Sequence, residues 1–332
     1  MILVTGGTGL LGSHLLYELL KSNQEIKALK RPSSNIEEVK RVFNYYPKGK
    51  ALFEKINWVD GDMLNYSDML EAMEGVDQIY HCAAIVSFEP KMKIKMIASN
   101  TNGTANLVNA AIEKKIKKFL HVSSTSAIGK APDGETANES MVWAEGKTNT
   151  GYSISKFRSE MEVWRGVEEG LNAVIVNPSI ILGAGYWLRG SSSMFSTMDK
   201  GMKYYTHGTT GYVGVWDVVK AMTQLMESNI SGERFLVTAD NYSYKQIFDL
   251  IAEALNKPKP KVEATKLLAE IAWRGDKLKS IFGGAHTFTK ERVRASRNVR
   301  RFDNRKVKEA LGIEFEPVED VIKRVADFYK RG

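Results

Sequence analysis

Short apolar runs alternate along this chain with stretches in which apolar residues recur every three to four positions. The first pattern is typical of buried parallel strands, and the second of helices that pack one face against a sheet. The apolar runs predict strands at residues 1–5, 25–29, 56–59, 78–84, 119–122, 173–176, 212–216 and 234–238. The helical spacing predicts a helix after the first strand as far as residue 21, and further helices at 35–46, 93–113, 152–169, 243–255, 288–297, 304–311 and 317–330.

This alternation predicts an α/β fold with a doubly wound parallel sheet of the Rossmann type, because strand–helix–strand crossovers are right-handed. Ligands of such folds bind beyond the carboxyl ends of the strands. We expect a nucleotide-binding domain over residues 1–180, with elements near 212–240 returning to it. Residues 181–332 are expected to form a smaller, mostly helical substrate-binding lobe. Within it, 183–211 lack clear periodicity, and Asp217 is a predicted helix N-cap.

The strongest local signal lies at the start of the chain, where an apolar strand is followed by a cluster of glycines and then at once by a helix. Backbone N–H groups at such a helix start bind phosphate, and glycines permit the sharp turn and the close approach of a pyrophosphate. The glycines fit a dinucleotide fingerprint either as Gly7-x-Gly9-x-x-Gly12 or as the variant Gly6-x-x-Gly9-x-x-Gly12. The structural alternative is an ordinary strand-to-helix turn, but the flanking strand and helix favour dinucleotide binding.

The end of the second predicted strand indicates which dinucleotide binds. An NAD enzyme usually carries an acid about 20 residues beyond the fingerprint, where it holds the ribose 2′-hydroxyl. Residues 28–35 contain no acid and instead carry Lys30 and Arg31, followed by Ser33 and Ser34. Cations here suit a 2′-phosphate and therefore predict NADP(H) over NAD(H), although two exposed charges at a strand end remain the structural alternative.

Composition narrows the class of protein. The 332 residues are 43% hydrophobic and 26% charged, which is typical of a soluble globular protein that needs no disulfide or metal staple. Cys82 is the only cysteine, no run is long and apolar enough for a bilayer, and the strand starting at Met1 leaves no room for a signal peptide. We therefore expect a cytoplasmic protein without a metal site. The net charge of +8 is scattered, so we expect no nucleic-acid partner.

One Tyr-x-x-x-Lys pair stands in a context that suits catalysis. Tyr152 and Lys156 lie one helical turn apart, after a parallel strand that ends in serines. A nearby cation lowers the pKa of a phenol toward the range useful for proton transfer. Ser124, at the end of that strand, could hydrogen-bond a substrate oxygen, or it could simply cap a turn as Ser123 or Thr125 could. The same spacing occurs, outside this context, at Tyr17/Lys21 and at Tyr46/Lys50, the latter in an expected loop.

These residues together resemble the extended short-chain dehydrogenase/reductase family, and within it the dihydroflavonol reductase and 3β-hydroxysteroid dehydrogenase branch. The resemblance covers nearly the whole chain. Besides the glycine turn and Tyr152-x-x-x-Lys156, it rests on Asp62, Ala83-Ala84, Asn100-x-x-Gly103-Thr104, Ser124, Asn177-Pro178 and Phe302-Asp303-Asn304.

The resemblance implies roles for particular residues. Tyr152 would be the proton donor or acceptor, Lys156 would hold the nicotinamide ribose, Ser124 would orient the carbonyl, and Asn100 would support a water relay. The residues expected to bind the cofactor are Gly6, Thr8, Gly9, Leu10, Leu11, Gly12, Lys30, Arg31, Asp62, Met63, Ala83, Ala84, Ile85, Tyr152, Lys156, Pro178 and Ile180. Those expected around the substrate are Ser87, Phe88, Trp143, Trp187, Arg189 and Tyr205, whose aromatic members could instead be core.

The sequence thus predicts an NADP(H)-dependent reductase of a hydrophobic ketone or aldehyde, with a homodimer suggested by resemblance alone. Two other hypotheses stay open: a sugar-nucleotide epimerase with tightly held NAD(P), and a non-catalytic NADP-binding redox regulator. The epimerase hypothesis is disfavoured by Lys30, where such epimerases usually have an acid. The regulator hypothesis is disfavoured by the complete catalytic set. A sugar-nucleotide dehydratase is disfavoured as well, because Thr125-Ser126 replaces the Asp-Glu pair of those enzymes.

Overall fold

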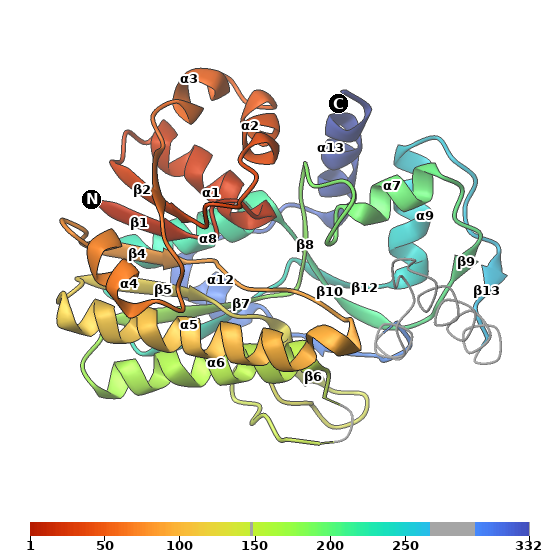
Figure 1. Cartoon of the computed structure of the whole chain (residues 1–332). Helices are drawn as coiled ribbons and strands as arrows, with labels where there is room; N and C mark the ends of the chain where they lie inside the picture. The colour runs from red at the N-terminus through yellow and green to blue at the C-terminus, as the bar shows by residue number, and fades with distance from the viewer. Residues whose placement is uncertain (147–148, 266–295, 332) are drawn as a thin grey trace.

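A seven-stranded sheet forms the centre of the molecule (Figure 1). The computed structural model describes residues 1–146, 149–265 and 296–331. The strands lie in the order β3-β2-β1-β4-β5-β7-β11, and all neighbours are parallel, which confirms the predicted fold class. Their bounds are β1 (Ile2–Thr5), β2 (Ile26–Lys30), β3 (Asn57–Asp60), β4 (Gln78–His81), β5 (Lys118–Val122), β7 (Ala173–Pro178) and β11 (Glu233–Val237).

The winding of the sheet reverses between β1 and β4. From β1 the chain adds strands toward one edge as far as β3, then crosses back to β4 and continues to β11 at the other edge. Such a reversal opens a crevice beyond the carboxyl ends of the two central strands. The predicted strand 78–84 is shorter in the structure, because the chain leaves the sheet after His81. Residues 82–85 then run along this crevice.

Helices cover both faces of the sheet, and each layer buries its own apolar cluster against the strands (Figure 1). The helices of one layer are α1 (Leu10–Lys21), α8 (Val215–Glu227) and α12 (Arg305–Leu311). Those of the other are α4 (Tyr66–Ala72), α5 (Lys93–Glu113) and α6 (Gly151–Glu168), of which the sequence pattern did not predict α4.

An insertion between β2 and β3 forms two short helices, α2 (Glu37–Asn44) and α3 (Gly49–Phe53). The pattern predicted only the first, so the expectation that Lys50 lies in a loop is wrong. The break between them explains the miss: Lys48 adopts a left-handed conformation, and a Cβ on Gly49 would come within 1.8 Å of the carbonyl oxygen of Phe43. Only a glycine lets the chain turn this tightly and start a new helix.

A smaller lobe lies beside the carboxyl edge of the sheet (Figure 1). The lobe contains a three-stranded sheet in the order β12-β10-β8. A third apolar cluster lies between this sheet and three helices. The elements are β8 (Ile180–Leu182), β10 (Thr209–Gly214), β12 (Asp240–Ser243), α7 (Ser193–Asp199), α9 (Tyr244–Ala254) and α13 (Val318–Arg331). The small sheet was not expected in a lobe predicted to be mostly helical.

Several local expectations need correction. The strand predicted at 212–216 ends at Gly214, which is itself the N-cap of α8, so Asp217 lies inside the helix. Its carboxylate accepts the backbone N–H of Glu316 at 3.0 Å. The helix predicted at 288–297 lies outside the described residues except for a turn at 296–297. Short remaining elements are η1 (Pro90–Met92), η2 (Thr125–Ala127), β6 (Thr136–Ala137), β9 (Tyr204–Tyr205), β13 (Val262–Glu263) and β14 (Arg301–Phe302).

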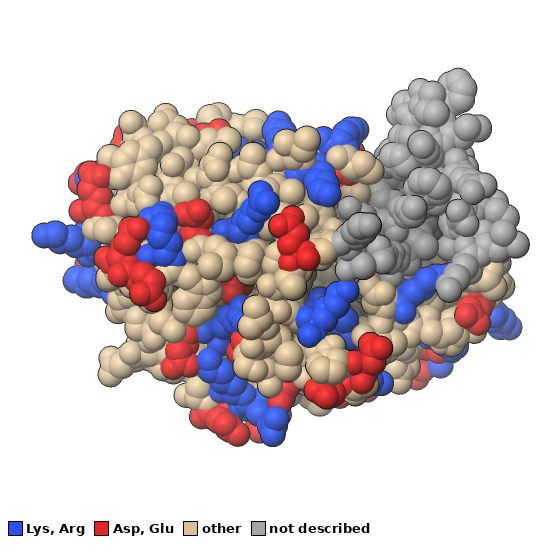
Figure 2. Space-filling model, turned by 90° about the horizontal axis from the view of Figure 1, so that it is seen from below, with Lys and Arg blue, Asp and Glu red and all other residues tan. Residues whose placement is uncertain are grey.

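Charged side chains of both signs are interspersed on the face drawn in Figure 2, and they form no block of one sign there. Within the described part of the chain, no helix combines the length and the apolar composition that a bilayer crossing requires.

Candidate active site

A large cavity follows the carboxyl edge of the sheet and continues between the sheet and the lobe. Its volume of about 2140 Å³ exceeds the roughly 300–1,000 Å³ of a site for one small ligand. The space is therefore sufficient for a dinucleotide and a second molecule together. One part is lined by the glycine turn and the end of β2, and another by the ends of β5 and α6 and by lobe residues.

The geometry of the glycine turn favours one of the two possible fingerprints. Gly6 has a φ of +72°, and a Cβ there would lie 2.5 Å from the backbone nitrogen of Ala83. A Cβ on Gly12 would lie 2.2 Å from the carbonyl oxygen of Gly6. Gly7 meets only the flexible end of Leu16. The backbone thus requires glycine at positions 6 and 12, which favours the variant Gly6-x-x-Gly9-x-x-Gly12. Gly12 acts by packing, since it does not line the cavity.

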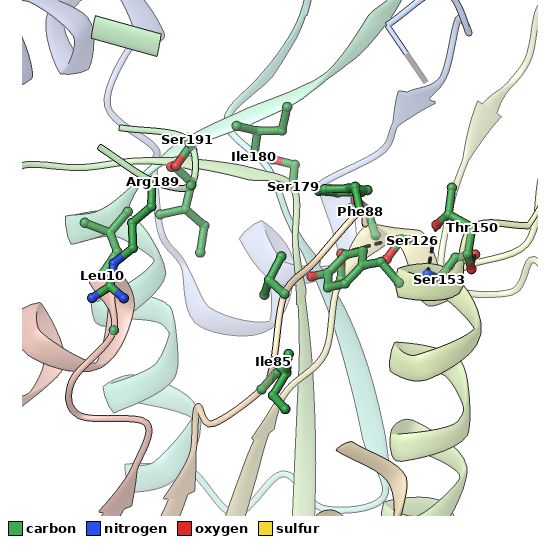
Figure 3. A pocket seen from close by; sticks show the side chains of 18 of the residues that line it. Leu10, Ile85, Phe88, Ser126, Thr150, Ser153, Ser179, Ile180, Arg189 and Ser191 are labelled. Carbon is green, nitrogen blue, oxygen red and sulfur yellow. Dashed lines mark hydrogen bonds between the residues drawn. The ribbon is translucent and has the colours of Figure 1, made fainter. Parts of the chain in front are cut away.

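The turn fits the phosphates of a dinucleotide. Gly9 is the N-cap of α1 and offers no side-chain cap, so the first N–H groups of the helix face the cavity without a competing carboxylate. Thr8, Leu10 and Leu11 line the same part of the cavity. On its other side lies the segment Ala83–Ile85, and the backbone of Ala83 approaches Gly6 closely (Figure 3 shows Leu10 and Ile85).

The end of β2 brings two cations and an unpredicted acid together. Lys30 and Arg31 both line the cavity, and Arg31 starts a turn closed by the N–H of Ser34 on its carbonyl at 2.8 Å. The ammonium of Lys30 forms an ion pair with Asp60, which lies directly opposite it on β3. The absence of an acid along β2 does not reveal this partner, because Asp60 comes from the neighbouring strand and is placed by the register of the sheet. Asp62 and Met63, after β3, line the cavity as well.

Tyr152 and Ser124 meet in the cavity. Tyr152 lies in the first turn of α6, which Thr150 caps by accepting the N–H of Ser153 at 3.0 Å, and Ser124 is the N-cap of η2. Figure 3 shows Thr150 and Ser153 near Phe88, whose ring centroid lies 5.9 Å from that of Tyr152. Burial raises the pKa of Tyr152 above its usual value of 10, and the hydrogen bond with Ser124 partly offsets this.

Lys156 is placed differently from the expectation. Its ammonium donates to the carbonyl oxygen of Val122 at 2.9 Å, and its side chain is buried behind the cavity surface and does not line it. Burial lowers the pKa of Lys156 to about 8. The predicted lowering of the tyrosine pKa by this lysine is therefore wrong for this arrangement, because desolvation of the phenol is the larger effect.

The two neighbouring serines point in different directions. Ser124 lines the cavity, whereas Ser123 is buried and donates to Glu160 at 2.6 Å. Glu160 also accepts from Asn177 at 2.7 Å and from Arg234 at 2.9 Å. Every oxygen of this buried carboxylate is thus hydrogen-bonded, as burial of a charge requires.

The hydrogen bonds around Glu160 also fix the position of the Ser124 backbone. Asn177 donates to the carbonyl oxygen of Ser124 at 3.1 Å. Arg234 donates to the carbonyl oxygens of Glu139 and Met141, which precede in the chain the cavity-lining residue Trp143. Sequence reasoning missed both charged partners. The available signal was the position of Glu160, one helical turn beyond Lys156 on α6.

Asn100 holds the chain after β4. Its amide donates to the carbonyl oxygen of Ile85 at 2.9 Å and to Ser155 at 2.7 Å, and it accepts the N–H of Ile85 at 2.8 Å. Both amide hydrogens are therefore used within the protein. This geometry shows a residue that positions the Ile85 segment beside α6, and it leaves no amide hydrogen for the expected water relay.

The predicted substrate residues separate into two groups. Phe88, Trp143 and Tyr205 line the cavity on the side of Ser124 and Tyr152, and Trp143 stacks on Phe157 with centroids 4.1 Å apart. Ser87 and Trp187 do not line it, and neither does Pro178, predicted to touch the cofactor, although Ile180 does. The indole of Trp187 donates to Tyr45, which follows α2, at 3.2 Å, and it packs against Tyr329 of α13. Trp187 therefore lies between the β2–β3 insertion and the lobe.

Arg189 lies with the phosphate turn and not with the catalytic pair. Figure 3 shows its guanidinium beside Leu10, at the first turn of α1. It also forms an ion pair of 2.9 Å with Glu38 of α2. The lobe thus contributes a cation to the nucleotide side of the cavity, a placement that spacing in the sequence could not indicate.

A binding crevice for a dinucleotide at the sheet switch point, with a tyrosine and a serine beside it, defines a dinucleotide-dependent enzyme of the Rossmann class. The model of the NAD dependent epimerase/dehydratase family matches residues 2–238, and the chain belongs to this family of extended short-chain dehydrogenases/reductases. It acts on a small-molecule substrate with an NAD(P) cofactor.

Named relatives cover almost the whole chain. It is 29% identical over 318 residues to a sterol demethylase protein B of Methylococcus capsulatus, covering 94% of this chain and 92% of that protein. It is 27% identical over 333 residues to a putative dihydroflavonol 4-reductase of Synechocystis, with 98% and 92% covered, which confirms the predicted branch. A dTDP-glucose 4,6-dehydratase of Streptomyces venezuelae shares the fold, with a TM-score of 0.78, 17% identity and 100% and 97% of the chains covered.

Proposed function

We propose that the protein is an NADP(H)-dependent reductase of a ketone or aldehyde in a hydrophobic small molecule. The observation that carries this proposal is that Ser124 and Tyr152 lie together in the wall of a cavity that also contains the glycine turn. Aromatic side chains at Phe88, Trp143 and Tyr205 give the substrate part of this cavity an apolar lining.

The chain's own residues supply acid catalysis. NADPH, when bound, supplies the hydride. Tyr152 donates its phenolic proton to the carbonyl oxygen, and the hydroxyl of Ser124 stabilises the charge that develops on that oxygen. Because burial raises the pKa of Tyr152 above 10, the phenol stays protonated at neutral pH, as a general acid for reduction requires. For Lys156 to hold the nicotinamide ribose, its ammonium would have to leave the carbonyl oxygen of Val122 and reach the cavity.

The remaining cofactor contacts follow the cavity wall. The glycine turn and Arg189 would hold the pyrophosphate, Asp62 and Met63 would flank the adenine, and Arg31 with Ser34 would hold the 2′-phosphate. Lys30 contributes less than we expected from the sequence, because Asp60 already neutralises it. We still expect NADPH to bind about 10-fold tighter than NADH, since a charge-assisted hydrogen bond is worth on the order of 1.5–3 kcal/mol and solvent reduces this at an exposed rim.

The direct test is NADPH consumption by the purified protein against a panel of aromatic, steroid and aliphatic carbonyl compounds, with NADH in parallel. Turnover of an apolar member with NADPH supports the proposal. Cofactor that survives purification, together with interconversion of sugar nucleotides and no net NADPH consumption, would instead establish the epimerase alternative. Tight NADPH binding without turnover of either class would indicate the regulator.

A homodimer through α5 and α6 also remains our proposal, and it rests on the family resemblance. These two helices pack side by side on one face of the sheet (Figure 1). Light scattering after size exclusion should give twice the 37.2 kDa of the chain, and a mass of one chain would contradict it.

A further inference from the structure

The substrate part of the cavity contains a cation that no acid within residues 1–146, 149–265 and 296–331 neutralises. Arg300 lines the cavity together with the aromatic residues Phe302, Tyr244 and Phe248. Its side chain is partly buried, and its guanidinium donates through one nitrogen to the carbonyl oxygens of Ile128 and Gly129, at 3.1 and 3.2 Å. Among the described residues, no carboxylate forms an ion pair with it.

The position of Arg300 relates it to the catalytic serine. Ile128 and Gly129 directly follow η2, the short helix that Ser124 caps, so the guanidinium lies against the same wall as the reacting group. The side chain also lies over the ring of Phe302, with the guanidinium carbon 5.1 Å from the ring centroid. In the described part of the chain its other N–H donors have no acceptor, and the surrounding wall is mainly apolar.

The charges around the cavity also favour an anionic ligand near Arg300. Among the described residues that line it, Asp62, on the nucleotide side, is the sole carboxylate, whereas Lys203 and Arg300 lie on the lobe side. A charge removed from water without a partner is costly, and an arginine fork matches a carboxylate in geometry. A ligand that brings its own anionic group would supply the missing partner.

We propose that the substrate is a hydrophobic carbonyl compound that carries an anionic group, and that Arg300 binds this group. The proposal rests on the proposed reductase function and specifies its substrate. Arg300 would act in ground-state binding, so its loss should raise the KM for acidic substrates far more than the KM for neutral ones.

The test compares matched pairs of substrates, 4-oxo-4-phenylbutanoate with its methyl ester and 4-formylbenzoate with its methyl ester. The unaltered protein should show a kcat/KM about 10- to 100-fold higher for the acids, the ratio that a charge-assisted hydrogen bond supplies. Arg300→Met should abolish this ratio by raising the KM of the acids. Arg300→Lys should restore part of it, and Arg301→Met, at the exposed neighbouring arginine, should leave it unchanged.

A binding measurement separates this proposal from the reductase function. Calorimetric titration with 4-phenylbutanoate, which has no carbonyl to reduce, should show Arg300-dependent binding whether or not any carbonyl is turned over. Titration with UDP distinguishes a phosphate-bearing ligand: Arg300-dependent binding of UDP and not of the carboxylate would place the anion on a nucleotide instead. Equal losses for acids and esters in both Arg300 variants would overturn the proposal and leave Arg300 as a support of the Ile128 segment.

Discussion

Among single residues, the phenol at the start of α6 has the most specific role in the proposed reaction. Tyr152→Phe keeps the ring that packs against Phe88 but removes the proton donor. We expect turnover to fall by roughly 10²–10⁴, the usual share of a general acid, with unchanged NADPH binding. Steady-state kinetics with the best substrate of the panel check this, and near-normal turnover would exclude Tyr152 as the acid.

The choice of control for that variant depends on the structure. Tyr46, the other tyrosine of a Tyr-x-x-x-Lys pair outside α1, accepts from the indole of Trp216 at 2.7 Å and also bonds His14. Tyr46→Phe would leave the indole N–H of the partly buried Trp216 without its acceptor, at a cost of about 1–3 kcal/mol of stability. Tyr17→Phe loses only a hydrogen bond of 3.2 Å to Pro47 and is the better control.

The two serines after β5 should respond differently to substitution. Ser124→Ala removes a cavity-facing hydroxyl and should lower kcat by about 10²-fold with little change in thermal stability. Ser123→Ala leaves Glu160 without one of its donors and should lower the melting temperature while changing kcat less. Kinetics and calorimetry on both variants check this. A larger loss of kcat in Ser123→Ala would mean that the other hydroxyl faces the substrate.

The ion pair of Lys30 with Asp60 leads to a prediction about the preference for NADPH over NADH. Asp60→Asn frees the lysine and removes a carboxylate from the rim, so the preference for NADPH over NADH should increase by several-fold. Lys30→Asp should invert the preference. Dissociation constants for both cofactors at two ionic strengths check this, and a preference for NADH in the unaltered protein would refute the NADP assignment.

At the scale of elements, the Glu160–Arg234 ion pair joins α6 to β11 behind the site, and hydrogen bonds to Glu160 add β7 and the residue after β5. Glu160→Gln removes the charge that pairs with Arg234 and weakens the hold on the backbone of Ser124. We expect kcat to fall about 10-fold. Because Ser124 lowers the pKa of Tyr152, a displaced Ser124 should also move the alkaline limb of the pH profile to higher pH.

A double-mutant cycle distinguishes positioning from general destabilisation. In the Ser124→Ala background, Glu160→Gln should have almost no further effect on kcat, since both changes act through the same hydroxyl. Additive losses in kcat would show that the ion pair acts on catalysis by another route. Arg165→Gln, on the exposed side of α6, is the matched control and should change neither kcat nor the pH profile.

At the scale of the whole molecule, three buried histidines make stability depend on pH. Burial lowers the pKa of His14 to about 4 and that of His81 to about 3, and it holds the pKa of His121 well below 6.5. The unfolded chain therefore binds these protons first as the pH falls. Their contribution to the folding free energy is complete above pH 6.5 and is lost as the pH falls toward the folded pKa. For His14 and His81 this loss is on the order of 1–2 kcal/mol each by pH 5.

Urea unfolding at pH 7.5 and pH 5 checks this dependence. His121→Leu should reduce it and should stabilise the protein at pH 5, because both ring nitrogens of His121 lack a partner in the described part of the chain. His207→Gln, at an exposed position, should leave the dependence unchanged. Equal stability of the unaltered protein at both pH values would contradict the pKa directions.

The sequence by itself determined what depends on residues close together in the chain. Gly6 and Gly12 specify the phosphate turn, because the positive φ of Gly6 and the close contacts at both positions exclude a Cβ. The same holds for most strands and helices of the sheet, since their apolar periodicity records which face is buried. The family and the fold class followed from these local signals.

The tertiary structure alone decided which distant residues meet. Asp60 reaches Lys30 through the register of two strands, and Arg234 reaches Glu160 across 74 positions of sequence. Arg189 and Arg300 enter the cavity from the lobe, where the sequence shows no periodicity that would orient them. Burial reversed the expected pKa shift of Tyr152 for the same reason: desolvation depends on everything packed around a side chain, and a spacing of four residues contains no information about it.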